Sequence, residues 1–340
     1  MSAQLVTGLD IGSSVIKVVV IRHDKKPHLM GFGSVKTPTP GLSSDNDLDI
    51  EAVATAVHGL LSSLDVPLDS VVAALPESKL FSRIISELPL LSDDELASAI
   101  KYSAEEFVPL PIDQVELYWQ VIERSKERNQ TVVLAIAVPK RIQEKYLKVL
   151  EMAQVKLRAL ETEMIAATRV LISNNLAVPT LLIEFGASST DMAVVSNGVI
   201  LLTRSIATGG LTLTRALSSY LNLQPLQAEE YKKVYGVLEN ELQGKVAITL
   251  KPLIDIISTE AQRTIQSFES KHPQSLIKRV VLSGGGAKLP GLMVYLAGRL
   301  GLEAQEADPW GFLEKDPSIA SRVATDPSYT IAVGLALRNE

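Results

Sequence analysis

The chain has 340 residues, of which 46% are hydrophobic and 21% are charged. This composition excludes a disordered or low-complexity protein, and the length predicts two domains or a duplicated core. The formal net charge of −6 argues against binding nucleic acid or an anionic membrane through bulk positive charge. Because cysteine is absent, disulfide bonds, thiolate metal sites and a cysteine nucleophile are excluded. No segment reaches the roughly 18–20 apolar residues of a membrane span, so we expect no direct membrane insertion.

The first 77 residues combine strand-like and helix-like patterns. β-Branched residues are frequent on both sides of the glycine turn at 10–14, which predicts a strand, a tight turn and a second strand. Apolar residues recur at helical spacing over 49–64. Strands are expected over 5–9, 15–21, 29–36 and 71–75. Because strands alternate with helix, the expected class is α/β.

A self-contained β-α-β-β-α insert is predicted over residues 78–156. Its first helix is expected to begin at Ser92, because Glu95 three residues later completes a capping box. Pro109 and Pro111 either only end this helix and fix an extended stretch, or frame a groove for a partner peptide. The other elements are expected as strands over 81–88, 115–124 and 131–138 and as a helix over 141–154.

An acidic glycine turn occurs twice in the sequence. Asp10 and Glu184 each begin a turn with glycine and serine between two apolar strands, and they are 184 − 10 = 174 residues apart. A repeat of this length predicts two halves that are built on one plan. A third glycine cluster, at 283–287, follows an expected strand, and the turn at 208–210 opens a helix expected over 211–221.

These turns have the chemistry of a phosphate site. Backbone N–H groups and serine hydroxyls at a glycine turn can bind phosphate oxygens, and glycine permits close approach. Asp10 and Glu184 are placed to hold Mg²⁺ through water, since hard cations prefer oxygen ligands. Lys17, seven residues after Asp10, can reach the phosphate as a point charge. One such turn would more often be a tight turn only, whereas two copies and a glycine cluster favour nucleotide binding.

The order of the three motifs resembles the phosphate-1, phosphate-2 and adenosine motifs of the actin/Hsp70 ATPase superfamily. Residues 163–167 and 331–336 resemble its two connecting segments. The resemblance implies an actin-like fold of two ribonuclease H-like halves, with ATP or ADP and Mg²⁺ as cofactors. The residues it implies to be catalytic are Asp10, Glu184 and Asp191, of which Asp10 and Glu184 hold Mg²⁺ through water. Those it implies to bind the nucleotide are Gly12, Ser13, Ser14, Lys17, Gly186, Ala187, Ser188, Ser189, Thr190, Gly209, Gly210, Glu229, Lys232, Lys233, Gly284, Gly285 and Gly286.

The sequence of the insert indicates which family of the superfamily the chain resembles. Residues 90–96 and 104–113 look like those of the PilM family, the actin-like proteins of type IV pilus assembly. The place of the insert is similar to that in FtsA, a division protein family, but the amphipathic C-terminal helix of FtsA is not expected here. We therefore favour PilM. The expected divisions are a first half with the phosphate-1 turn (1–77), the FtsA-type insert (78–156), a connecting helix (157–178), a second half with the phosphate-2 and adenosine motifs (179–330) and a C-terminal helix that returns to the first half (331–340).

Resemblance to PilM implies a scaffold in the cytoplasm that is peripheral to the inner membrane through a partner. The implied partner is the short cytoplasmic peptide of a PilN-like inner-membrane protein, bound near the insert. Other pilus platform or motor proteins, and a homo-oligomer, are further partners that the family allows, whereas nucleic acid is not expected.

The second phosphate motif departs from the superfamily. Glu184 stands where the superfamily usually has Asp, and Ala187 and Ser188 replace two glycines. A longer carboxylate shifts the metal-water shell, and the added side chains restrict approach to the γ-phosphate, so we expect a weak ATPase at most. Two alternatives stay open: a filament-forming membrane adaptor like FtsA, and a small-molecule kinase of the same superfamily.

Overall fold

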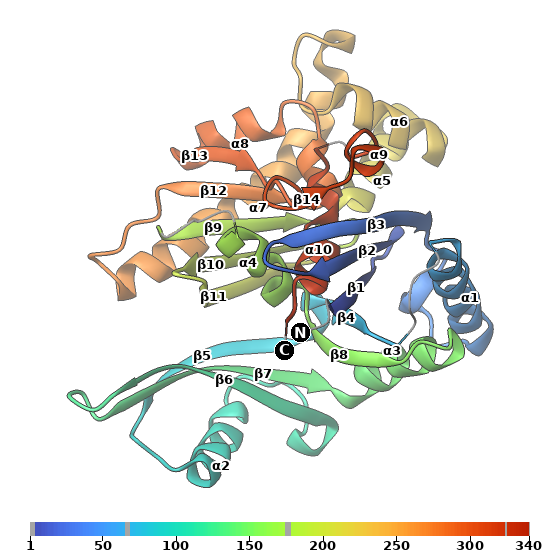
Figure 1. Ribbon diagram of the computed structural model, residues 1–340. Coiled ribbons are helices and arrows are strands. Elements are labelled where there is room, and N and C mark those ends of the chain that lie inside the picture. The colour runs from blue at the N-terminus through green and yellow to red at the C-terminus, as the bar shows by residue number, and fades with distance from the viewer. Residues whose placement is uncertain (1–3, 65–68, 174–177, 324, 340) are drawn as a thin grey trace.

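Figure 1 shows a computed structural model of the chain, which describes residues 4–64, 69–173, 178–323 and 325–339. The expected divisions also include the residues outside this description, which are 1–3, 65–68, 174–177, 324 and 340. The described residues form two α/β halves and a smaller insert that lies along one side of them (Figure 1). Within the described ranges, no helix is both long enough and apolar enough to cross a membrane.

The first half is built on a six-stranded sheet in the order β14-β3-β2-β1-β4-β8. Strands β1 to β3 form an antiparallel meander, and β4 and β8 run parallel to β1. Both faces are covered, since Val18 and Val20 pack in one core and Val19 and Ile21 in another. The strands are β1 (Gln4–Ile11), β2 (Val15–His23), β3 (Pro27–Lys36), β4 (Val71–Leu75), β8 (Leu157–Thr162) and β14 (Glu314–Lys315). The helices are α1 (Asp47–Ser63), α3 (Lys140–Met152), α4 (Glu163–Ser173) and α10 (Thr330–Ala336).

The second half repeats this plan on a five-stranded sheet in the order β11-β10-β9-β12-β13. A meander of β9 to β11 is again followed by parallel strands, which confirms the two halves that the repeated turn predicts. The strands are β9 (Thr180–Phe185), β10 (Thr190–Ser196), β11 (Val199–Ile206), β12 (Arg279–Ser283) and β13 (Glu303–Glu306). The helices are α5 (Gly210–Leu221), α6 (Pro225–Tyr235), α7 (Lys245–Lys271) and α8 (Leu292–Leu300).

The insert is a three-stranded sheet in the order β5-β7-β6 with α2 on one face. Its elements are β5 (Phe81–Leu88), α2 (Asp93–Ala104), β6 (Val115–Ser125) and β7 (Gln130–Pro139). The predicted capping box is present, because the backbone N–H of Ser92 donates to Glu95 at 2.9 Å. The other face of the sheet packs into the core of the first half through Leu134 and Ile136. Helix α3, which we expected within the insert, packs on α1 and β4 of the first half and also contacts β7 of the insert.

The end of the chain joins the two halves. After β13 the chain crosses to the first half, where β14 pairs with β3 and Trp310 is buried with the ring of Phe32 at 5.4 Å. The short helix α9 (Pro317–Ala320) follows, and α10 then packs against α4. A side chain at Gly334 would collide with the backbone of Ala166, so glycine permits this close helix contact. The two segments predicted to connect the halves therefore lie side by side.

Candidate functional site

The phosphate-1 turn joins β1 to β2. Asp10 and Lys17 are direct cross-strand partners in this hairpin, and the Lys17 Nζ lies 3.1 Å from Asp10 Oδ2. The spacing of seven residues is therefore the register of a hairpin rather than a coincidence. Although burial of the ammonium opposes it, attraction to Asp10 raises the pKa of Lys17 above its ordinary value. Lys17 thus stays charged at the end of the hairpin.

A residue that the sequence did not single out holds this turn in place. The buried Thr37, just after β3, donates its hydroxyl to the carbonyl of Gly12 at 2.7 Å, and its backbone N–H donates to the Ser14 carbonyl at 3.0 Å. A Cβ at Gly12 would stand 2.8 Å from the Val15 carbonyl oxygen, so glycine is required there. Thr37 reaches the turn because β3 pairs with β2. The residues around Thr37 in the sequence do not by themselves predict these bonds.

The phosphate-2 turn repeats the geometry with different charges. Glu184 and Asp191 are cross-strand partners of β9 and β10, again seven residues apart because 191 − 184 = 7. Asp191 therefore occupies the place that Lys17 has in the first half. Glu184 accepts a hydrogen bond from the Ser283 hydroxyl, and Asp191 accepts one from the Ser189 hydroxyl at 2.8 Å. The second half thus presents two carboxyl groups where the first presents an ion pair.

Backbone bonds tie the phosphate-2 turn to the start of α5. The N–H groups of Gly210 and Leu211 donate to the carbonyls of Gly186 and Ala187 at 3.0 and 2.9 Å. A Cβ at Gly209 would lie 2.6 Å from the Ala187 carbonyl oxygen. Gly209 and Gly210 therefore allow the helix to approach the turn, and their predicted contact with a phosphate stays a prediction.

The hydroxyl residues of this turn divide into two kinds. Ser189 and Thr190 are buried; Ser189 donates to Asp191, and Thr190 donates to the carbonyl of Thr208 at 2.6 Å. Ser188 is exposed and its hydroxyl lies 2.8 Å from that of Ser13 in the phosphate-1 turn. The structure therefore brings the tips of the two predicted phosphate turns together, with Ser13 and Ser188 at the contact.

Five carboxyl groups gather behind the two turns. Burial, together with the neighbouring Asp10 and Asp191, raises the pKa of Glu184 to about 8, although the Ser283 hydrogen bond and the charge of Lys17 oppose the shift. Burial also raises the pKa of Asp191. Oδ1 of Asp191 is buried and has no hydrogen-bond partner at bonding distance among the described residues, although the Ser205 hydroxyl is near enough to favour the ionised form of this carboxyl. A buried carboxylate oxygen without a donor fits a cation or water in this cleft.

Glu77 and Glu163 complete this cluster and were not predicted as site residues. Burial and the charge of Asp191 raise the pKa of Glu77 to about 7. Burial, together with Asp191 and Asp10, raises the pKa of Glu163 well above its ordinary value. Both residues follow parallel strands, β4 and β8, at their carboxyl ends, where α/β sheets bind ligands. That position is the signal by which the sequence could have found them.

The adenosine motif contains one open glycine. A Cβ at Gly284 would collide with Glu184 and one at Gly286 with the ring of Phe185, so these two glycines let the motif pack on β9. Gly284 also has a φ of 82°, a left-handed conformation that favours glycine. Gly285 is exposed, and a Cβ added to it would have no described atom within 4 Å. Only this glycine of the three leaves space for a ligand at its Cα.

The residues of α6 that were predicted to contact adenosine partly bond to other residues of the protein. Lys232 Nζ lies 2.6 Å from Glu229 Oε2 and donates to the Gly210 carbonyl at 3.0 Å. Although burial opposes it, hydrogen bonds from Lys232 and Thr214 hold the pKa of Glu229 below its ordinary value. Lys233 is exposed beside Glu229. Lys232 therefore links α6 to the first turn of α5, whereas Lys233 forms exposed ion pairs with Glu229 and Glu230.

The described residues of the cleft do not form a cage of protein ligands for a metal ion. Among the residues that the structure describes, no three His, Asp or Glu side chains are arranged to hold a metal ion. Water-mediated contacts to Asp10 and Glu184 therefore fit the residues better than a protein cage. Such contacts suit Mg²⁺, which keeps most of its water ligands.

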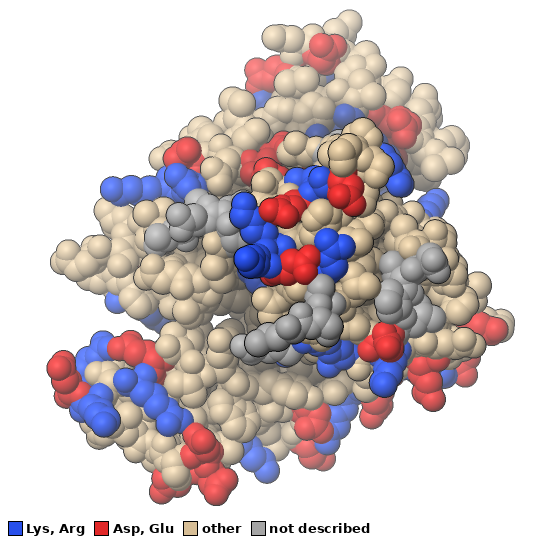
Figure 2. Space-filling view, viewed as in Figure 1, with Lys and Arg blue, Asp and Glu red and all other residues tan. Residues whose placement is uncertain are grey.

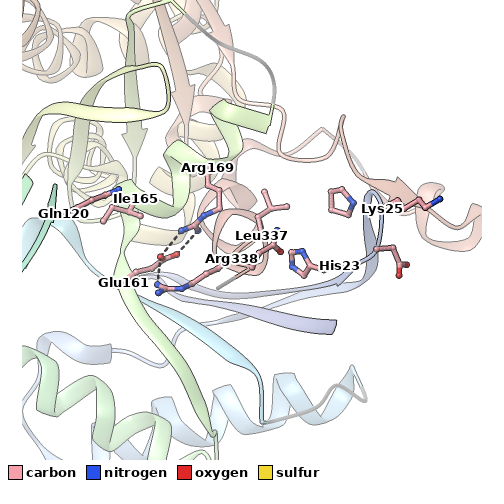
Figure 3. A pocket seen from close by; sticks show the side chains of 11 residues that line it. His23, Lys25, Gln120, Glu161, Ile165, Arg169, Leu337 and Arg338 are labelled. Carbon is pink, nitrogen blue, oxygen red and sulfur yellow. Dashed lines mark hydrogen bonds and ion pairs between the residues drawn. The ribbon is translucent and has the colours of Figure 1, made fainter. Parts of the chain in front are cut away.

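A separate groove of about 680 Å³ lies between the first half and the insert (Figure 3). Glu161 lines this groove and accepts hydrogen bonds from Arg169 at 2.8 and 3.0 Å and from Arg338 at 3.0 Å. Gln120 of β6 lies at one end, and Lys25 at the other. Basic and acidic side chains are mixed over the face in Figure 2, and the groove has the same mixture.

Comparisons with known proteins agree with this geometry. The family model described as "Type IV pilus assembly protein PilM" matches residues 8–340. A solved PilM–PilN type IV pilus biogenesis complex is similar to this chain with a TM-score of 0.86 and 26% identity, covering 98% of each chain. The cell division protein FtsA of Neisseria meningitidis serogroup B is 24% identical over an alignment of 370 residues, gaps included, which covers 96% of this chain and 88% of that protein.

A more distant structure supports the fold class. MreB5 of Spiroplasma citri has a TM-score of 0.55 at 15% identity and covers 98% of this chain and 95% of its own. Together with the repeated sheets, these likenesses confirm the predicted actin-like fold.

Proposed function

The chain belongs to the PilM family of type IV pilus assembly proteins, and from this we propose that it is a nucleotide-binding scaffold that binds the cytoplasmic tail of a PilN-like inner-membrane protein. It would lie at the cytoplasmic face of the inner membrane through that partner. Nucleotide binding is supported by the contact between the two predicted phosphate turns at Ser13 and Ser188. The likeness to a PilM–PilN complex carries the partner part.

Each residue of the cleft has a role in this proposal. The hydroxyls of Ser13, Ser14 and Ser188 would bind phosphate oxygens, and the charged Lys17 would offset their negative charge. Asp10 and Glu184 would hold the waters around Mg²⁺, which would neutralise charge on the phosphates. Gly285 would lie against the adenosine, because its Cα faces open space.

Turnover is expected to be slow for a physical reason. A general base must be deprotonated near neutral pH to accept a proton from water. Glu163 is the carboxyl at the start of α4, and its pKa is raised well above the ordinary value by burial and by neighbouring carboxyl groups. A raised pKa disfavours the ionised form that a general base needs, so Glu163 would activate water less well than an ordinary carboxylate.

The groove between the first half and the insert is the proposed site for the peptide. In the part of the chain that the structure describes, β6 is an edge strand of the insert sheet, so its outer edge could pair with an extended chain. The groove also offers Lys25 as a donor and Asp24 as an acceptor to a short peptide segment.

Two titrations on one sample test the proposal. Mg-ATP should bind with little turnover, and a labelled peptide of the PilN-like cytoplasmic tail should bind the same protein. Lys25→Glu should weaken binding of the peptide. Lys126→Glu, at an exposed lysine in the hairpin of the insert, should leave peptide binding unchanged. Equal peptide affinity in both variants would place the peptide elsewhere.

The same sample separates the alternatives. The FtsA relatives favour polymerisation as the second candidate, and sedimentation with Mg-ATP would detect filaments. Phosphate transfer to a sugar or an acid would instead identify a kinase.

A further inference from the structure

Glu77 lies where three parts of the molecule meet. It follows β4 of the first half and precedes β5, the first strand of the insert, and it is 5% exposed. Its backbone N–H donates to Glu163 Oε2 at 3.0 Å, so it is fixed to α4. One of the two connections between the first half and the insert is therefore anchored to the carboxyl cluster of the cleft.

Side-chain bonds extend this anchor to the insert and the second half. The hydroxyl of Ser82, on β5, lies 3.2 Å from Glu77 Oε1 and 2.6 Å from the hydroxyl of Thr203 on β11. Strands β5 and β11 lie side by side at this point (Figure 1). A hydrogen-bonded path thus runs from the cleft through Glu77 and Ser82 to the second half.

The carboxyl of Glu77 is not fully satisfied. Its second oxygen, Oε2, is buried and has no partner at bonding distance among the described residues, although Thr162 and the backbone of Met164 are near enough to favour its ionised form. The charged groups that face it are Asp191 on β10 and Glu163 on α4. A buried oxygen without a donor costs free energy, so a movement of its surroundings that supplied a donor would be favoured.

We propose that the Glu77–Ser82–Thr203 contact couples the nucleotide cleft to the insert, so that a bound Mg-nucleotide changes the affinity of the groove for its peptide. The inference rests on the proposed function and names its regulation. A hydrogen bond of 2.6 Å is lost after a shift of about 1 Å. Rotation of the second half against the first must therefore either break the Ser82–Thr203 bond or carry β5 with it.

Both of these movements would change the geometry of the groove. Strands β5, β7 and β6 are one sheet, and Gln120 on β6 forms one end of the groove, whereas Glu161 and Arg169 belong to the first half. A movement of β5 relative to the first half therefore changes the width of the groove. Glu77, Ser82 and Thr203 are positioning residues in this scheme and do not touch the nucleotide.

The test measures the peptide dissociation constant with and without Mg-AMPPNP on the full chain. The wild type should show a ratio of at least about fivefold, the lower end of ordinary coupling. Ser82→Ala and Thr203→Val should both bring the ratio close to one while Mg-AMPPNP affinity is retained. Ser86→Ala, an exposed position on the same strand, is the matched control and should keep the wild-type ratio.

A wild-type ratio of one with both ligands bound would overturn the inference and leave the proposed function standing. Unchanged ratios in Ser82→Ala and Thr203→Val would also overturn it. If the peptide fails to bind, only the groove assignment fails. Hydrogen exchange of β5, measured with and without Mg-AMPPNP, then tests the coupling instead of the peptide titration. Protection that changes in the wild type but not in Ser82→Ala supports it, and equal behaviour refutes it. Absence of Mg-AMPPNP binding would overturn both proposals.

Discussion

The hydroxyl groups of Ser13 and Ser188 lie 2.8 Å apart, so the phosphate turns of the two halves are hydrogen-bonded to each other. Both residues are exposed, and the bond joins positions 175 residues apart in the chain. A bond of this kind contributes only about 0.5–1.5 kcal/mol, so a phosphate that offers its own acceptors can replace it. The contact therefore marks where a nucleotide would part the two turns.

Ser188 is predicted to control the choice between ATP and ADP. Ser188→Gly removes a side chain from the place where a γ-phosphate would enter, and it should shift the ratio of affinities towards Mg-ATP by about threefold, about 0.65 kcal/mol. Ser188→Thr should shift it in the other direction because it adds a methyl group. Calorimetric titration with both nucleotides measures the ratio, and the same ratio in both variants would mean that Ser188 does not face the γ-phosphate.

Asp10 is predicted to be required for the magnesium form of the nucleotide. Asp10→Asn should weaken the binding of Mg-ATP by about tenfold or more, which corresponds to about 1.4 kcal/mol. It should weaken the binding of ATP in the presence of EDTA much less. It should also cost about 1–3 kcal/mol of stability, because the buried Lys17 loses its anionic partner. Urea unfolding separates the two effects, and Asp94→Asn on the exposed face of α2 is the control. Equal loss with and without Mg²⁺ would argue against a metal role for Asp10.

The sequence predicted the parts of the site that depend on local register. The seven-residue spacing of Asp10 and Lys17 follows from a two-stranded hairpin, and the same spacing of Glu184 and Asp191 follows from its repeat. Short-range patterns of this kind are visible in one chain, because a hairpin fixes which residues face each other.

Contacts between distant elements could not be predicted in this way. Thr37 holds the phosphate-1 turn only because β3 pairs with β2, and Glu77 joins the cleft only because β4 lies beside β8. The inward direction of Thr190 likewise depends on the Thr208 carbonyl, just before α5 begins. Each of these roles is set by packing between segments that the sequence separates.

The three glycines of the adenosine motif are predicted to respond differently to alanine. Gly285→Ala should fold normally, since its Cβ would meet open space, but it should weaken Mg-ATP because that space would hold adenosine. Gly284→Ala should instead lower stability, because its Cβ would collide with Glu184 and its φ is positive. Thermal unfolding and nucleotide titration of both variants are the measurements. Unchanged affinity in a folded Gly285→Ala would exclude adenosine from this turn.

The buried carboxyl groups are predicted to make the protein less stable as the pH rises through neutrality. Glu184 has a folded pKa of about 8 against an ordinary value of 4.5, so between these values the folded protein holds a proton that the unfolded chain has lost. Stability falls with pH wherever the folded state binds more protons. Glu77, with a pKa of about 7, adds to the fall over a narrower range.

Urea unfolding at about pH 5.5, 7 and 8.5 should therefore show a loss of stability of at least about 1.4 kcal/mol, the value of one pKa unit. Glu184→Gln cannot lose a proton and should reduce the slope, whereas Glu87→Gln, at an exposed position on β5, should leave it unchanged. Saturating Mg-ATP should also flatten the dependence, because a cation beside Asp10 and Glu184 favours their ionised forms. A slope that Glu184→Gln does not alter would show that Glu184 is already ionised in the folded protein and that the cleft is more open to water than its burial indicates.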